Sequence, residues 1–272
     1  IGLLKLKSKK STENHLPLNE DFSQEFYSLL PFKPTNAQKK AVSECINDML
    51  GDKAMNRLIQ GDVGSGKTAV AAAVMYSTVK SGYQAAMMAP TEILATQHFD
   101  SLSKLFEGCN IKIALLTGAT KAKDKRTIKE ALMNGEIDIV VGTHALIQND
   151  VEFKSLALVI TDEQHRFGVE QRASLAMKGD NPHLMVMSAT PIPRTLGLII
   201  YGDLDISIIN ELPPGRQSIR TDVVNSTYHE RIYAFIKKAI DDGREAYIVC
   251  PLVDDGENDL MSAKEYAEKL AS

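Results

Sequence analysis

The run Gly61-Asp62-Val63-Gly64-Ser65-Gly66-Lys67-Thr68 has the residue types and spacing of a phosphate-binding loop, G-x-x-x-x-G-K-S/T. Glycines let backbone N–H groups turn inward around phosphate oxygens, Lys67 adds a positive charge, and the Thr68 hydroxyl can sit on Mg²⁺. Chance produces the four fixed positions in only about 1% of chains of this length. We therefore predict that the loop binds ATP through Gly61, Gly64, Ser65, Gly66, Lys67 and Thr68.

An acidic pair follows directly after an apolar run. The residues from Ala157 to Ile160 lead to Thr161-Asp162-Glu163-Gln164-His165. Asp162, at the end of a buried strand, is predicted to hold Mg²⁺ through water, with Thr68 as the other protein group at the metal. Glu163 can orient or deprotonate the water that attacks the γ-phosphate. Lys67, Asp162 and Glu163 are thus candidate catalytic residues.

Short apolar runs alternate with longer helical patterns after Pro34, which is typical of an α/β fold with a mostly parallel sheet flanked by helices. The loops after the carboxyl ends of parallel strands gather on one edge of the sheet, where ligands bind. Both motifs are expected on that edge. Strands are predicted at Arg57–Gln60, Gln84–Ala89, Lys112–Leu116, Asp138–Val141, Leu156–Thr161 and Leu184–Ser188, and helices from Thr35, Lys67, Glu92, Ala122, Gly168 and Pro193.

The segment Asn210-Glu211-Leu212-Pro213-Pro214-Gly215-Arg216 interrupts the alternation, because paired prolines stop a helix and glycine frees the chain to turn. We interpret residues 211–217 as a hinge. The alternation then restarts with strands at Ser218–Val224 and Ala246–Cys250 and a helix over Thr227–Asp241. Residues 31–210 are therefore predicted to form the first domain and 218–272 the truncated start of a second. Residues 1–30 are predicted to be a linker or the remnant of an upstream region, with an amphipathic helix between Asn19 and Leu30.

Composition excludes several classes of protein. Of the 272 residues, 44% are hydrophobic and 24% charged, which fits a packed core and argues against disorder. No apolar run approaches the roughly 20 residues of a bilayer-spanning helix. The three cysteines are far apart and lack metal-ligand spacing, so we expect reduced thiols in the cytoplasm. With a net charge of −4 the chain has no overall positive charge that would attract nucleic acid, so any contact with DNA must involve a small part of its surface.

From Pro31 onward the chain resembles the motor region of the RecG family, bacterial ATP-dependent DNA helicases of superfamily two. The resemblance is carried by the phosphate-binding loop, by the hinge, and by the runs Asp162-Glu163-Gln164-His165-Arg166-Phe167-Gly168-Val169 and Ser188-Ala189-Thr190-Pro191-Ile192-Pro193-Arg194-Thr195-Leu196. It implies two RecA-like domains that close around ATP and Mg²⁺ and act on branched DNA, including replication forks and Holliday junctions, in repair and recombination. The location that it implies is the bacterial cytoplasm, in association with the nucleoid.

The resemblance also assigns further residues. It implies that Gln38 reads the adenine edge; by spacing alone, Thr35 and Gln38 fit a capping box equally well. It implies that one DNA strand contacts the loops after three strands, at Pro90, Thr91, Thr117, Gly118, Thr143 and His144, although a threonine at such a junction is often a plain helix cap. Ser188, Ala189 and Thr190 are expected to couple ATP hydrolysis to DNA grip, with His165 as a fourth catalytic residue. His98 and His183 receive no role.

Two other functions remain open. Transcription-repair coupling translocases share much of this pattern but typically have Phe where Ser65 stands and Glu where Gln164 stands, so those two positions favour the RecG family. A regulatory P-loop ATPase that never touches nucleic acid is disfavoured by the Ser188-Ala189-Thr190 run. The resemblance also implies that an arginine of the second domain reaches the γ-phosphate when the two domains close, and that the motifs carrying it are not among these residues. We therefore expect this chain to bind ATP–Mg²⁺ and to hydrolyse it slowly, without strong stimulation by DNA.

Overall fold

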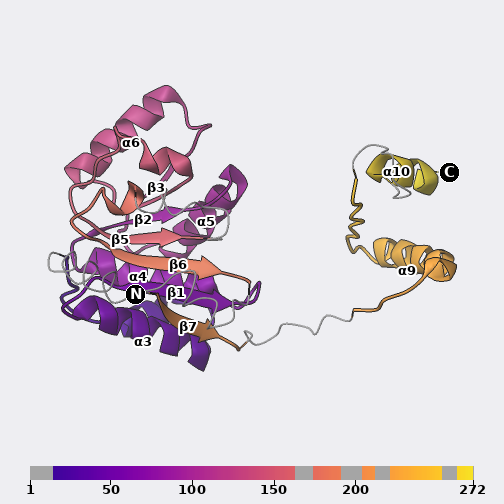
Figure 1. The fold of residues 1–272 in the computed structure, drawn as a ribbon, viewed down its shortest axis with the longest axis horizontal. Coiled ribbons are helices and arrows are strands. Elements are labelled where there is room, and N and C mark those ends of the chain that lie inside the picture. The colour runs from indigo at the N-terminus through magenta and orange to yellow at the C-terminus, as the bar shows by residue number, and fades with distance from the viewer. Residues whose placement is uncertain (1–14, 163–173, 191–203, 212–220, 253–261, 272) are drawn as a thin grey trace, which may run out of the picture. The chain divides into compact units, whose positions relative to one another are not determined.

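In the part of the chain that the structure describes, seven parallel strands form one sheet in the order β3-β4-β2-β5-β6-β1-β7. The computed structural model describes residues 15–162, 174–190, 204–211, 221–252 and 262–271. Figure 1 shows β3 and β7 at opposite ends of the sheet. The strands are β1 (Asn56–Gly61), β2 (Gln84–Met88), β3 (Ile113–Leu116), β4 (Ile139–Gly142), β5 (Leu156–Thr161), β6 (His183–Ser188) and β7 (Asp205–Ile209). The predicted α/β class is confirmed, and β1 to β6 lie where the sequence predicts strands.

Successive residues of the central strands alternate between two apolar cores. Met87 packs into one core with side chains from α2 to α5, and its neighbour Met88 packs into the other with Leu132 of α6. Every residue of β2 and β5 is buried, as expected of parallel strands covered on both faces. The sheet is therefore a rigid platform whose carboxyl edge positions the loops that follow each strand.

The helices begin close to the predicted residues: α3 (Asn36–Leu50), α4 (Lys67–Lys80), α5 (Glu92–Leu105) and α6 (Ala122–Asn134). Helix α4 is rich in alanine and is buried from Val70 to Thr78, because small side chains of high helix propensity allow close packing against the sheet. The helices expected from Gly168 and Pro193 lie outside the described residues.

The amino-terminal segment packs against the sheet domain. Within the predicted amphipathic stretch, α2 forms over Ser23–Leu29, and its Phe26 is fully buried against the rings of Tyr76 and Phe106. The chain before α2 is held by His183, the first residue of β6. The His183 Nε2 lies 2.9 Å from the Leu16 carbonyl oxygen, and its Nδ1 lies 3.0 Å from the Met55 amide nitrogen.

Strand β7 is absent from the sequence prediction because polar and apolar residues do not alternate with burial at its centre. Its polar Ser207 is buried, whereas its apolar Ile208 is 58% exposed. Ser207 can face inward because Arg57 of β1 donates to its hydroxyl at 3.0 Å, and the hydroxyl donates in turn to Glu44 of α3. Polar groups that satisfy one another thus replace the apolar alternation by which a strand is recognised.

The chain divides into two compact units, Ile1–Arg216 and Gln217–Ser272. The described part of the second contains the short 3-10 helix η3 (Ser226–Tyr228), α9 (His229–Asp241) and α10 (Ala263–Ala271). The strand predicted at Ala246–Cys250 is wrong: these residues have no strand structure, and Val249 is 92% exposed with no described strand to pair with. Residues 221–224 are not a strand either, and 218–220 lie outside the described residues. The predicted domain boundaries stay predictions.

None of the helices in the described ranges has the length and hydropathy to cross a bilayer.

Candidate nucleotide and DNA site

The loop between β1 and α4 has the backbone conformation that its glycines allow. Gly64 and Gly66 lie in the left-handed region, with φ of +77° and +86°. Gly66 is also the residue before α4, and a Cβ at this position would collide with the Gln38 side-chain amide. The loop therefore requires glycine at position 66 for two independent reasons, backbone conformation and space.

Lys67 is held against the loop by the loop's own backbone. Its Nζ donates to the Gly61 carbonyl oxygen at 2.8 Å and to the Asp62 carbonyl oxygen at 3.0 Å. Ser65 is fully buried, and its hydroxyl has no hydrogen-bond partner among the described residues. Thr68 lies half-buried in the first turn of α4. Positive charge, a spare buried hydroxyl and a helix amino terminus thus lie together, a combination that favours an anion.

Gln38 connects the start of α3 to this loop. The capping box is present: the Thr35 hydroxyl accepts from the Gln38 N–H, and the Gln38 Oε1 accepts from the Thr35 N–H at 2.9 Å. The Gln38 Nε2 also donates to the Ser65 carbonyl oxygen at 2.8 Å, and the side chain is almost wholly buried. The structure thus gives Gln38 a capping role and a contact with the phosphate-binding loop; its adenine role stays a prediction.

Asp162 follows β5 and is fixed by contacts to the neighbouring β2 and to the helix after it. Its backbone N–H donates to the Met88 carbonyl oxygen at 3.0 Å, and its Oδ2 lies 2.7 Å from the Nε2 of His98 on α5. Both side chains are 11% exposed. The partner residue His98 is missing from the sequence prediction. Glu163 and His165 lie outside the described residues.

The run Ser188-Ala189-Thr190 begins at the last residue of β6, which lies between β1 and β5. Ser188 is aligned with Gln60, the residue before the phosphate-binding loop. The Ser188 Oγ accepts from the Thr190 N–H at 3.2 Å and lies 2.8 Å from the Thr190 Oγ1. These contacts are local ones of the kind that a buried serine makes with its own backbone. Coupling through Ser188, Ala189 and Thr190 therefore stays a prediction.

The predicted DNA-binding residues follow three adjacent strands, β3, β4 and β2. Thr91, after Pro90, caps α5 by accepting from the Leu94 N–H at 3.2 Å, which is the plain capping contact. Thr117 and Gly118 follow β3, and the Thr117 N–H donates to the Thr120 hydroxyl at 3.0 Å. Thr143 follows β4; its hydroxyl is buried without a hydrogen-bond partner among the described residues, and the adjacent His144 is exposed.

The carboxyl edge of the sheet therefore has two parts. The nucleotide half contains the phosphate-binding loop, the run Ser188-Ala189-Thr190 and Asp162, at the ends of β1, β6 and β5. The DNA half contains the predicted DNA-binding loops, which follow β2, β4 and β3. The boundary lies between β5 and β2, at the contact of Asp162 with His98. Glu92, in the first turn of α5, joins two of the loops by accepting from the Ala119 N–H at 2.8 Å. One rigid edge thus carries both predicted sites.

The donor groups of the nucleotide half fit Mg²⁺ bound together with phosphate. Across the described ranges, no group of three or more His, Cys, Asp or Glu side chains is placed to hold a metal ion by itself. Mg²⁺ needs no such group, since it is usually bound by one or two carboxylates, phosphate oxygens and water. Asp162, with its side chain 11% exposed, and the half-buried Thr68 hydroxyl supply a set of this kind.

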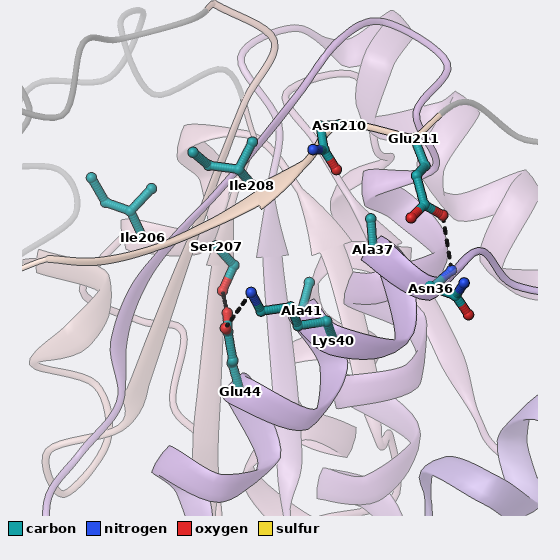
Figure 2. Close-up of a pocket in the computed structure, with 10 residues that line it drawn as sticks. All are labelled: Asn36, Ala37, Lys40, Ala41, Glu44, Ile206, Ser207, Ile208, Asn210 and Glu211. Carbon is teal, nitrogen blue, oxygen red and sulfur yellow. Dashed lines mark hydrogen bonds and ion pairs between the residues drawn. The ribbon is translucent and has the colours of Figure 1, made fainter.

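A separate cavity of about 510 Å³ lies between α3 and β7. Figure 2 shows its polar contacts: Glu44 with both Ser207 and Lys40, and the Asn36 N–H, which donates to the Glu211 Oε2 at 3.0 Å. None of the predicted site residues that the structure describes lines this cavity. Its polar groups fix the edge strand and residue 211 to α3, so we assign it a structural role.

The family model for DEAD/DEAH box helicases matches residues 35–199. The chain is similar to the ATP-dependent DNA helicase RecG of Bacillus subtilis, with 52% identity over 97% of this chain and 39% of the relative. The same-named protein of Thermotoga maritima is 48% identical over the whole chain and 35% of the relative. The chain thus spans less than two fifths of the length of these curated relatives.

The similarity to RecG extends to a solved structure. The structure of RecG bound to a three-way DNA junction superposes with a TM-score of 0.81 and 46% identity, covering 92% of this chain and 34% of that one. A DEAD box protein of Methanococcus jannaschii, at 24% identity and a TM-score of 0.53, shares the fold.

Proposed function

Since the chain belongs to the DEAD/DEAH box helicase family, in its RecG group, we propose that it is the ATP-binding motor part of a helicase that remodels branched DNA. The observation that carries this proposal is the divided sheet edge, where a phosphate-binding loop and Asp162 lie beside three loops suited to a DNA backbone. In this proposal residues 31–210 are the first motor domain, 211–217 the hinge, and 218–272 the beginning of the second.

The proposed cofactors are ATP and Mg²⁺. Backbone N–H groups from Gly64 to Thr68 surround the phosphates, Lys67 neutralises part of their charge, and Gln38 lies beside the loop for the base. Thr68 and, through water, Asp162 hold Mg²⁺, which when bound offsets the charge that develops on the phosphate oxygens. Glu163 orients or deprotonates the attacking water, and His165 with Ser188, Ala189 and Thr190 connects this site to the DNA side.

The proposed macromolecular partner is branched DNA, such as a fork or a Holliday junction. Pro90, Thr91, Thr117, Gly118, Thr143 and His144 offer backbone N–H groups, hydroxyls and an imidazole, which suit phosphate oxygens and carry no sequence preference. A RecG relative has been solved with a three-way DNA junction. An enzyme with this substrate works on the bacterial nucleoid, in the cytoplasm.

Binding of a fluorescent ATP analogue to this chain tests the nucleotide half of the proposal. Replacement of Lys67 with alanine removes charge-assisted contacts worth about 1.5–3 kcal/mol, so the affinity should fall roughly tenfold to a hundredfold. Lys123→Ala, which changes an exposed lysine on α6, is the matched control. No binding by the unmodified chain, or equal binding by the two variants, would overturn the proposal.

A further inference from the structure

We propose that His98 is a positioning residue that holds the Asp162 carboxylate in the orientation needed for the metal, an inference that rests on the proposed function. The two side chains come from different elements, α5 and the end of β5, and their closest atoms, Nε2 and Oδ2, are 2.7 Å apart. An ionised carboxylate only accepts hydrogen bonds, so the hydrogen in this contact belongs to the His98 Nε2.

The contact orients Asp162 because His98 is itself fixed. The apolar residues Ala95 and Leu102, three before and four after His98 on α5, are fully buried in the core. The start of the helix is held by the Thr91 cap and by the bond from Glu92 to the loop after β3. An imidazole on such a helix has little freedom, so it selects one orientation of the carboxylate that it touches.

A buried histidine can also contact a carboxylate only because its ring nitrogen needs a hydrogen-bond partner. The position of His98 favours the orienting role over this alternative. Asp162 is the acidic residue of the nucleotide half, while α5 is capped in the DNA half by Thr91, seven residues or about two helical turns before His98. The contact therefore joins the two halves of the sheet edge at the boundary between β5 and β2. Outer partners that orient a metal-binding side chain typically account for 10–100-fold in metal affinity.

The test compares three variants of this chain by titration with a fluorescent ATP analogue, each with and without MgCl₂. His98→Leu removes the donor, whereas His98→Gln places an amide N–H near the position of Nε2. Asp100→Asn, an exposed change on the same helix, is the matched control. For His98→Leu we expect the MgCl₂ concentration needed for half of the Mg²⁺-dependent gain in affinity to rise by about tenfold or more. His98→Gln should stay within about threefold of the unmodified chain and Asp100→Asn should not change, because both keep a donor to Asp162.

Affinity for the analogue without Mg²⁺ reports the phosphate-binding loop alone, so unchanged metal-free binding shows that His98→Leu has kept the fold of the site. If His98→Leu fails to fold, His98→Asn, whose shorter side chain cannot reach Asp162, replaces it. The inference is overturned if the leucine or asparagine variant responds to Mg²⁺ like the unmodified chain, or if glutamine loses as much as leucine. Failure of the proposed function is a different result, namely no binding by the unmodified chain.

Discussion

His183 should make the stability of the sheet domain depend on pH. Burial lowers the pKa of His183 to about 4, from an ordinary value of 6.5. The geometry requires the neutral ring, since Nδ1 faces the Met55 N–H and must accept from it, while Nε2 donates to the Leu16 carbonyl oxygen. A proton on Nδ1 would break the first bond and leave a charge where the side chain is fully buried.

The sign and size of the effect follow from linkage. Above a pH of about 7 the ring is neutral in both folded and unfolded chains, so its full contribution to stability is present. As the pH falls below the unfolded pKa of 6.5, only the unfolded chain binds the proton, and stability is lost until the folded pKa of about 4 is reached. At about 1.4 kcal/mol per pKa unit, the total loss is about 3 kcal/mol, of which about 2 kcal/mol falls between pH 8 and pH 5.

Urea denaturation followed by circular dichroism, at about pH 8 and about pH 5, measures this loss. Many groups titrate in this range, so the informative quantity is the difference between the unmodified chain and His183→Gln, whose amide can accept from Met55 and donate to Leu16 without titrating. The unmodified chain should lose about 2 kcal/mol more than the variant. His144→Gln, at an exposed histidine, should show no such difference. A His183 difference below about 0.5 kcal/mol would refute the reasoning.

Two further changes test the packing of the amino-terminal helix and the loop. Phe26→Ala should lower the free energy of unfolding by about 3–5 kcal/mol, because a fully buried ring is lost. Phe32→Ala, at a side chain that is 44% exposed, should lower it far less. Similar urea midpoints for the two variants would contradict this packing. Gly66→Ala should weaken binding of the ATP analogue at least tenfold, since the Cβ displaces the Gln38 amide. Gly82 has the same φ of +86°, but the space around a Cβ at this position is open, so Gly82→Ala is the control. Equal binding of the analogue by the two variants would show that the collision with Gln38 does not weaken binding.

Much of the fold and part of the site could be predicted from the sequence because their signals are local. The glycines and Lys67 define the loop by spacing, and the fully buried β5 appears as an apolar run that delivers Asp162. His98 gave no such signal. It lies seven residues after Thr91, on a helix that was predicted, but its contact with Asp162 depends on β2 lying beside β5 in the sheet. Strand order is a long-range property, and the local patterns that predict each strand do not contain it.

Buried polar side chains account for other differences between the sequence prediction and the structure. Ser207 is buried because Arg57 and Glu44, far away in the chain, satisfy its hydroxyl, so the alternation that identifies a strand is interrupted in β7. His183 is likewise buried because Leu16 and Met55 supply partners to both ring nitrogens. In each case the deciding partner is distant in sequence, and no local pattern contains it.

The bond from the Asn36 N–H to Glu211 has a mechanical consequence. Asn36 is the first residue of α3, two positions before Gln38, which touches the phosphate-binding loop through Ser65. Tension applied to the chain from its carboxyl-terminal side therefore reaches the body of the domain at the start of α3, before it loads the edge strand β7. A pull along this route therefore acts on the end of α3 that carries the contact between Gln38 and Ser65.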